Sequence, residues 1–321
     1  MRVRFPHARV LLPRTRLAYV HVGNLLGDAK RDRAARVFGY VAVWLPDELV
    51  ILFLQEGEVV NATVQDSAGT RPIPIQEALD RIPTGSELGE ICFHEADDEQ
   101  LACMFSSLSS PVEPWPEGLD AADPAALFPY LMSTTFDGLV EINVCGAVNY
   151  LIFRDGTVKR AFLSDGSSAT LVSRVQVLFD DAAGNGWPDV RRWPVPPALP
   201  VQAPHALIQA YRELTAAMVK RLVENGRESA PDIAEHARQS LLDRHPALEA
   251  LAISDRERPD PVADAETLTD AVAAWITEIL WTAADQESVT PEQLLRELAF
   301  ERRHLFQSVG LFERLPFEVD W

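Results

Sequence analysis

Two stretches of the chain consist of hydrophobic runs of strand length separated by short polar breaks. They span residues 39–64 and 138–163. Each contains three such runs, rich in β-branched and aromatic residues, which is typical of β-strands. In both stretches an acidic residue followed by glycine separates the second run from the third. Each stretch therefore predicts a three-stranded antiparallel meander.

The acidic-Gly pairs predict tight hairpin turns. The first pair is Glu56-Gly57 and the second is Asp155-Gly156. A two-residue hairpin needs positive φ at both central residues, which glycine adopts at little cost. The two pairs lie 99 residues apart, and the glycine that opens each stretch recurs at the same offset. The pattern predicts that the chain contains an internal duplication.

Helical periodicity flanks the two meanders. Residues 75–82 place apolar side chains at the i, i+3, i+4, i+7 spacing of a helix that lies on one face of a sheet. Further helices are expected over residues 28–37, 97–108, 125–134 (with Pro129 inside it) and 168–179. Residues 2–22 alternate loosely and predict short strands or an extended arm, and residues 89–94 predict another strand.

Two proline-rich segments indicate domain boundaries. Residues 109–120 hold three prolines around Trp115, and residues 188–204 hold six prolines. Such segments resist regular structure and stay fairly extended. They divide the chain into domains at residues 1–110, 111–200 and 201–321.

Beyond Pro204 the hydrophobic period changes from that of strands to that of helices. The expected helices cover residues 207–222, 233–242, 245–251, 268–280 and 290–309. The last of them has a strong start signal, because Thr290 and Gln293 form a capping box and Pro291 occupies the first helical position. The fold class predicted is α+β: two tandem domains with antiparallel meanders and flanking helices, followed by an all-α helical bundle.

The last seven residues alternate again between apolar and polar positions. Leu315, Phe317, Val319 and Trp321 are apolar, with acidic residues before and after Val319. This pattern predicts a strand, with Pro316 suggesting an edge. Either the tail packs its aromatic side chains onto its own chain, or it adds as a strand to a sheet edge of a repeat domain or of a partner.

The two meanders resemble the PATAN-type domain of bacterial signalling proteins. The resemblance covers Phe38-Gly39 to Ala62 in the first repeat and Phe136-Asp-Gly138 to Ala161 in the second. That family has a glycine opening a strand, a Phe-x-Asp-Gly-like turn and a Val-x-x-Ala segment followed by a helix. The first repeat departs from this pattern with Leu-Gln-Glu-Gly at its turn. The resemblance implies non-enzymatic protein contacts in signalling or motility, and it carries over no catalytic residue.

Composition excludes several classes of partner. The chain has 321 residues and a formal net charge of −19. This charge argues against nucleic acid and against anionic membrane surfaces, both of which attract clustered Lys and Arg. No apolar stretch is long enough to cross a bilayer. Cys92, Cys103 and Cys145 lack metal-ligand spacing and are expected to be buried reduced thiols, so a cytoplasmic protein is predicted.

No motif for catalysis, cofactor binding or a metal site is present. Gly-x-Ser-x-Gly, Walker, Gly-x-Gly-x-x-Gly and His-Glu-x-x-His patterns are all missing. His94 with Glu95, Asp97, Asp98 and Glu99 matches no standard metal spacing, and the segment is interpreted as the acidic start of a helix. The basic cluster 302–304 is expected to pair with Glu297 and Glu301, or to contact an acidic partner.

Aromatic residues outside the predicted strands are the candidate partner contacts. Trp115, Trp187 and Trp193 stand among prolines, where they either pin the linkers onto the domains or form a contact surface; Phe317 and Trp321 complete the set. The function predicted is a scaffold or adaptor that binds another protein, with the oligomeric state left open. The alternative is a small-molecule sensor whose pocket, between meander and helix, is lined by Trp44 or Tyr150. An enzyme whose active site leaves no linear motif is a third alternative.

Overall fold

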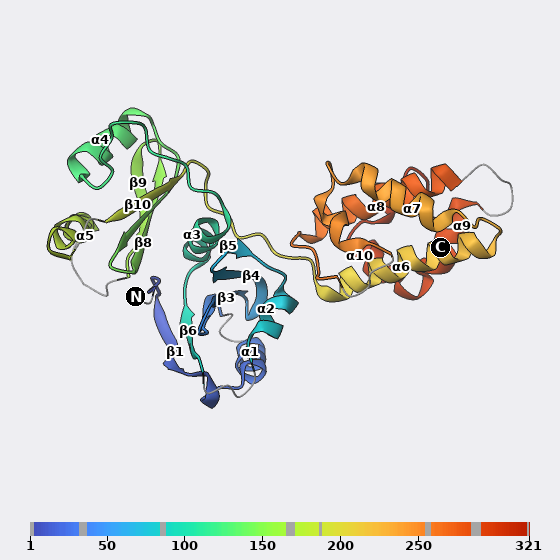
Figure 1. The fold of residues 1–321 in the computed structure, drawn as a ribbon, viewed down its shortest axis with the longest axis horizontal. Helices are drawn as coiled ribbons and strands as arrows, with labels where there is room; N and C mark the ends of the chain where they lie inside the picture. The colour runs from blue at the N-terminus through green and yellow to red at the C-terminus, as the bar shows by residue number, and fades with distance from the viewer. Residues whose placement is uncertain are drawn as a thin grey trace. The chain divides into compact units, whose positions relative to one another are not determined.

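The computed structural model describes residues 3–31, 37–83, 88–164, 171–185, 188–253, 258–283, 290–319 and 321. The chain divides into two compact units, Met1–Pro200 and Val201–Trp321. The first unit contains two antiparallel sheets, of six and four strands, and the second is helical (Figure 1). The mixed α+β class with a helical C-terminal region is therefore confirmed.

The first sheet has the strand order β1-β6-β2-β3-β4-β5. Its strands are β1 (Arg9–Arg16), β2 (Gly39–Trp44), β3 (Leu49–Gln55), β4 (Glu58–Asp66), β5 (Gly69–Pro72) and β6 (Glu90–Glu95). Its helices are η1 (Leu17–Tyr19), α1 (Val22–Arg31), α2 (Ile75–Arg81) and α3 (Asp98–Ser109).

The second sheet has the strand order β10-β7-β8-β9. Its strands are β7 (Gly138–Val144), β8 (Ala147–Arg154), β9 (Thr157–Phe162) and β10 (Asp189–Trp193). The helices α4 (Pro124–Ser133) and α5 (Leu171–Asn185) belong to it.

The two sheets contain the same four-stranded frame. Strands β6-β2-β3-β4 of the first sheet match β10-β7-β8-β9 of the second in order and in direction. The register also matches: Tyr40 lies opposite His94, and Leu139 lies opposite Trp193, both shifted by 99 residues. The duplication thus extends beyond the meander to a fourth strand.

Both predicted hairpin turns are confirmed. Positive φ angles occur at Glu56 (51°) and Gly57 (81°), and at Asp155 (49°) and Gly156 (68°). The turns are also anchored in the same way. The Gly57 amide donates to the carbonyl oxygen 20 residues before it at 2.8 Å, and the Gly156 amide does the same at 3.0 Å.

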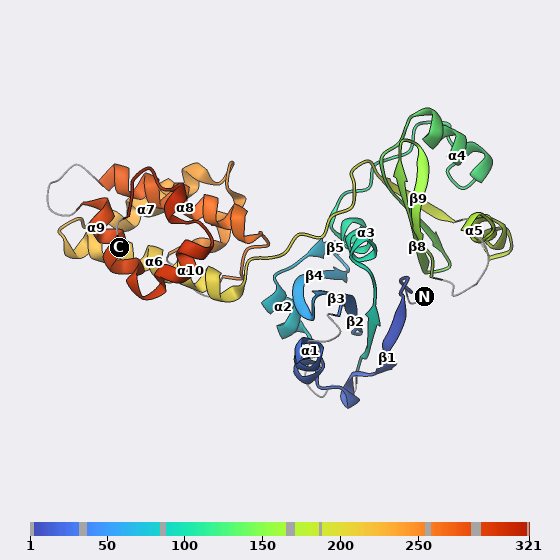
Figure 2. The same cartoon turned by 180° about the vertical axis from the view of Figure 1, so that it is seen from behind.

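Helices cover both faces of each sheet in the first unit. Helices α1 and α2 pack on one face of the first sheet, and α4 and α5 pack on one face of the second. The other two faces share one core with α3, which both views place between the sheets (Figures 1 and 2). Leu101, Met104 and Phe105 of α3 belong to this shared core, together with Tyr40 and Tyr150 from the two sheets.

The segment before β1 also joins the two sheets. Phe5 is buried in the shared core, and the Tyr40 hydroxyl donates to the Pro6 carbonyl at 3.2 Å. On the other side, the Arg4 amide donates to Gly146 O at 2.8 Å, and the Val148 amide donates to Arg4 O at 2.9 Å.

The second unit is built on two long helices. Its elements are α6 (His205–Glu224), α7 (Ala230–Leu241), η2 (Pro246–Leu251), α8 (Ala265–Ala283), α9 (Pro291–Ala299), η3 (Phe300–Arg302), α10 (Arg303–Ser308) and η4 (Phe312–Arg314). Trp275 of α8 is fully buried, and its indole N–H donates to Ala234 O at 2.8 Å. Across the described ranges, no helix has both the length and the hydrophobicity needed to cross a bilayer.

Several sequence-based expectations were wrong in detail. Residues 17–22 form a 3-10 turn and the start of α1 rather than a strand, so the helix expected over residues 28–37 begins at Val22; residues 32–36 lie outside the described ranges. Strand β5 was not expected. Strand β10 lies within the expected linker, because its five residues contain no proline although prolines flank them on both sides.

The last predicted helix is also shorter than expected. Thr290 caps it as predicted, with its side chain accepting a hydrogen bond from the Gln293 amide. However, α9 ends at Ala299, and a 3-10 turn separates it from α10. The segment 245–251 is a 3-10 helix rather than an α-helix.

Candidate docking site at one end of the first sheet

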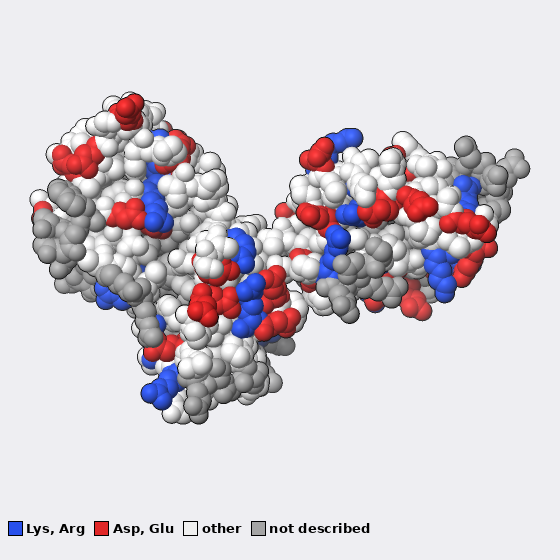
Figure 3. Space-filling model, in the orientation of Figure 1, with Lys and Arg blue, Asp and Glu red and all other residues white. Residues whose placement is uncertain are grey.

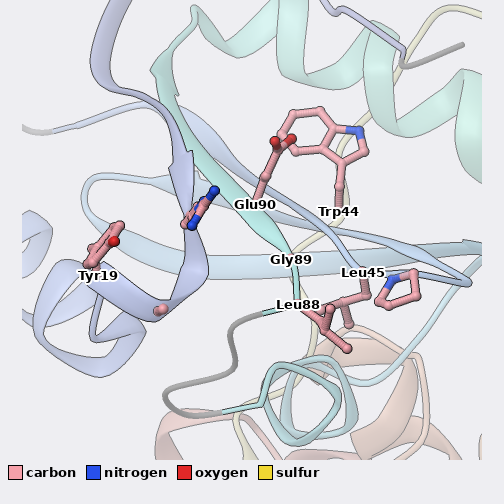
Figure 4. A pocket seen from close by; sticks show the side chains of 9 residues that line it. Tyr19, Trp44, Leu45, Leu88, Gly89 and Glu90 are labelled. Atoms are coloured by element: carbon pink, nitrogen blue, oxygen red, sulfur yellow. The ribbon is translucent and has the colours of Figure 1, made fainter.

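A hollow of about 780 Å³ lies at the end of the first sheet where β1 finishes and β6 begins (Figure 4). Its walls come from η1, from the end of β2 and the turn after it, and from the residues that lead into β6. We call this site the Tyr19 hollow. Its lining residues are Arg16, Ala18, Tyr19, Trp44, Leu45, Pro46, Leu88, Gly89 and Glu90.

The 3-10 turn η1 turns Tyr19 toward solvent. Leu17 is fully buried, and its amide donates to Gly89 O at 3.0 Å, which fixes the turn against the start of β6. The Val20 amide then donates to Leu17 O at 3.0 Å and closes the turn. Burial of Leu17 leaves Tyr19 on the outer side, where 77% of its surface is exposed.

Leu88 is the second exposed apolar residue of the hollow. It is 68% exposed, and Gly89 after it has a φ of 135°. A Cβ at Gly89 would lie 3.2 Å from Trp44 O and 3.3 Å from a methyl group of Leu45. Glycine therefore lets β6 begin close against β2, and Leu88 stays outside this contact.

Trp44 and Glu90 form another wall of the hollow, and Arg14 lies against both of them. Trp44 lies opposite Glu90 in the pairing of β2 with β6. The Arg14 guanidinium lies 4.0 Å above the Trp44 ring and also donates to Glu90. β1 carries a register shift between Leu12 and Thr15, where proline is tolerated in an edge strand. Figure 4 shows Trp44 and Glu90 on one side of the strands and Leu88 on the other.

A smaller hollow of about 410 Å³ adjoins the first and shares Leu45, Pro46 and Leu88 with it. Two ion pairs lie at or beside it. Arg81 binds Glu48 at 2.6 Å, and a hydrogen bond from Arg71 lowers the pKa of the Asp66 carboxyl. On the face drawn in Figure 3, acidic and basic side chains of this unit are interspersed.

Arg16 differs from these paired arginines. It is exposed at the rim of the hollow, and it has no ion pair with any residue that the structure describes. Its cross-strand neighbour is Glu90, whose carboxylate binds Arg14. The Tyr19 hollow therefore combines exposed apolar side chains with one uncompensated positive charge. This combination suits non-covalent recognition of an amphipathic group.

A separate groove of about 710 Å³ lies in the first unit, between the C-terminal part of α3 and the two proline-rich segments. Trp193 and Glu113 line it. Glu113 binds Arg192 at 2.7 Å, and Ser106 holds Ala198 through hydrogen bonds to its amide (3.1 Å) and its carbonyl (3.3 Å). The groove is thus a seam at which the linker is attached to α3.

The tryptophans proposed as partner contacts have different surroundings. Trp193 is 4% exposed in the shared core, and its indole N–H donates to Ser110 O at 3.1 Å, so it is not a contact surface. Trp115 is half-buried and donates to Val190 O at 2.8 Å. For both residues the structure favours the alternative that they pin the linkers. Trp187 lies outside the described residues.

The C-terminal tail packs onto its own unit. Phe317 and Val319 contact the core of the helical unit, and the Trp321 ring meets the Phe312 ring edge-on at 5.0 Å. The strand predicted for this segment is wrong for its described residues, which are bent or irregular. Trp321 is 43% exposed, so part of its ring faces solvent.

Other candidate residues also have identifiable roles. Cys92 and Cys103 are buried as expected, whereas Cys145 is exposed because it occupies a turn with positive φ. Arg302 binds Glu213 of α6 at 2.5 Å rather than Glu297 or Glu301.

The acidic segment after β6 is the start of a helix, as interpreted from the sequence. Asp97 caps α3 and binds Arg160 of β9 at 2.6 Å. Among the described residues, no group of three potential metal ligands occurs.

The two residues suggested for a sensor pocket differ in position. Trp44 lines the Tyr19 hollow, although this hollow lies at the end of the sheet rather than between meander and helix. Tyr150 is fully buried, and its hydroxyl is hydrogen bonded to Ser107 at 2.9 Å, so it belongs to the shared core.

Sequence reasoning missed the key residues of the hollow. Tyr19 lies in the segment 2–22, whose loose alternation predicts strands or an extended arm, and nothing in the sequence distinguishes Arg16 from the other charged residues. Leu88 offered a signal, because it is a single apolar residue between Ser-Glu and Gly. Comparisons with protein-family models, with curated proteins and with solved structures found no match for this chain.

Proposed function

We propose that the protein is a non-enzymatic scaffold or adaptor that holds a partner protein in the Tyr19 hollow. The observation that carries the proposal is the exposure of Tyr19 (77%) and Leu88 (68%) beside a concave surface. Burying one large apolar side chain contributes about 1.5–3 kcal/mol, so covering both would supply a substantial part of a binding free energy.

The setting proposed for this role is a bacterial signalling or motility pathway. Its support is the resemblance of the two meanders to PATAN-type domains, carried by the segments ending at Ala62 and Ala161. Such interaction domains act by contact, which agrees with a site made of apolar side chains and a charged rim.

Affinity capture from the native host tests the proposal. We expect the wild-type chain to retain a stoichiometric partner that the double variant Tyr19→Ser/Leu88→Ser loses. The matched control is Met132→Ser/Val177→Ser, which alters two exposed apolar residues of α4 and α5 (61% and 44% exposed). Equal retention by both double variants would contradict the proposal.

A small-molecule sensor is the second candidate function. The volume of the Tyr19 hollow, about 780 Å³, falls within the range of roughly 300–1,000 Å³ typical of ligand pockets, and Trp44 supplies an aromatic wall. Native mass spectrometry of the purified chain distinguishes the two. A metabolite bound to the wild type and lost with Tyr19→Ser/Leu88→Ser would favour the sensor.

A further inference from the structure

We infer that the partner segment carries an Asp or Glu side chain next to a large apolar side chain, with the carboxylate bound by Arg16. This inference rests on the proposed function and specifies the partner's chemistry. Three observations carry it: the unpaired charge of Arg16, the pairing of the surrounding cations, and the exposed apolar residues beside them.

The charge of Arg16 is not compensated within the described part of the protein. Glu90, directly across the strand pair, binds Arg14 instead. Arg14 is held there by two contacts, since its guanidinium also lies over the Trp44 ring. The neighbouring Arg81 and Arg71 are occupied by Glu48 and Asp66. Of the described arginines around the two hollows, Arg16 is therefore the one available to an external anion.

The kind of anion follows from charge and surroundings. A guanidinium presents a planar fork that matches a carboxylate, and arginine is enriched at protein interfaces. The chain carries a net charge of −19, which disfavours polyanions such as nucleic acid or an anionic membrane. A single carboxylate on an otherwise apolar segment fits one unpaired cation beside Tyr19 and Leu88.

The arrangement gives each group of the partner segment its own place. The apolar side chain enters the hollow beside Tyr19 and Leu88, where it is removed from water. The adjacent carboxylate binds Arg16 at the rim. Rim charges of this kind contribute mainly to specificity and to the rate of association.

A random peptide display library selected on the full-length chain tests the inference. Peptides retained by the wild type but not by Tyr19→Ser/Leu88→Ser should be enriched in Asp or Glu next to Leu, Ile, Phe or Trp. Selection on Arg16→Glu should replace the acidic residue with Lys or Arg. The control Lys159→Glu makes the same charge change at an exposed β9 residue, and it should leave the selected sequences unchanged.

Binding measurements with a selected peptide give the magnitude. Loss of one rim ion pair in Arg16→Gln should weaken binding by roughly two- to fivefold, and the repulsion in Arg16→Glu should weaken it further. Both effects should shrink as salt is added. Inorganic phosphate is then added as a competitor of the bound peptide. If phosphate displaces the peptide as effectively as unlabelled acidic peptide does, Arg16 binds a free anion and the inference is overturned.

The outcomes separate this inference from the proposed function. Apolar residues enriched without a neighbouring acidic residue would overturn the role of Arg16 and leave the docking site standing. The same peptides retained by Tyr19→Ser/Leu88→Ser would overturn both. The side chains changed in these variants are all exposed: Arg16, Tyr19, Leu88 and Lys159. The circular dichroism spectrum of each variant should therefore match that of the wild type.

Discussion

Equivalent positions on the inner faces of the two sheets carry different side chains, although both faces pack on α3. Ala42 and Ile51 of the first sheet correspond to Glu141 and Tyr150 of the second. Glu141 is only 6% exposed, next to fully buried Tyr150. The duplicated frame thus tolerates an apolar core in one copy and a polar cluster in the other.

The segments around the two frames differ more than the frames themselves. In the first sheet, β1 and β5 flank the frame at either edge. In the second, β9 ends at Phe162, equivalent to Thr63 within β4, and Arg4 hydrogen bonds to the start of β8. The Tyr19 hollow combines both kinds of segment: η1 and the end of β1 contribute Tyr19 and Arg16, and the frame contributes Trp44 and Glu90. The repeated frame therefore sets the fold, and the segments added to it supply the exposed Tyr19 and Arg16 by which the two copies differ.

The largest effect is expected where the two frames are most alike. A Cβ at Gly39 or Gly138 would overlap the backbone oxygen of His94 or Trp193 in the neighbouring strand. Gly39→Ala and Gly138→Ala should each destabilise the first unit by about 3 kcal/mol or more, with the greater loss at Gly138, whose φ is 151°.

Hydrogen exchange of the sheet amides in urea measures this loss. Gly27→Ala in α1 is the control, because its Cβ would meet no neighbour, and alanine should stabilise the helix by about 0.5–1 kcal/mol. If Gly39→Ala or Gly138→Ala left the stability unchanged, the two glycines would not have equivalent roles in the two repeats.

The polar cluster makes the second sheet sensitive to pH. Burial raises the pKa of Glu141 to about 7, against the opposing effect of the nearby Arg191. Because the folded state binds this proton more tightly, the stability contributed by the group is present below pH 4.5 and is lost as pH rises toward 7. The loss amounts to about 3 kcal/mol.

Glu141→Gln isolates this contribution. The amide cannot ionise, so the variant should gain stability relative to the wild type as pH rises from 5 to 8. Urea unfolding of both proteins at several pH values, with the difference plotted against pH, measures it. A difference that is constant with pH would show that Glu141 titrates normally.

A smaller effect is expected from the ion pairs that join the two repeats. Arg160 of β9 binds Asp97 at 2.6 Å and Glu99 at 2.5 Å at the start of α3. All three side chains are about half exposed, so Arg160→Gln should cost roughly 0.5 kcal/mol, and less at high salt. A loss as large as that of Gly138→Ala would mean that charge, rather than the shared core, joins the sheets.

Local signals were sufficient for much of the fold. The acidic-Gly turns, the runs of β-branched residues and the cap at Thr290 each depend on neighbouring residues alone, and the structure confirms them. Strand β10 was missed because flanking prolines masked a short run whose partner, β7, lies about 50 residues earlier. Pairing over such distances leaves little trace in a single sequence.

The candidate site was harder to predict than the fold. Tyr19 is exposed because the Leu17 amide donates a hydrogen bond to the Gly89 carbonyl, a contact between residues about 70 positions apart. Trp193 is a candidate contact by its sequence, because prolines surround it, but in the structure it packs into the core shared with α3. Exposure is decided by tertiary packing, so residue type alone could not separate these two aromatic residues.

Site-specific photo-crosslinking from position 19 tests the docking site most directly. A photoreactive phenylalanine analogue replaces Tyr19 in the native host, and the same analogue at Met132, which is also exposed, serves as the control. The account predicts one protein crosslinked from position 19 and absent from position 132, and lost when Leu88→Ser is added. No crosslinked protein at position 19, or the same proteins at both positions, would contradict it.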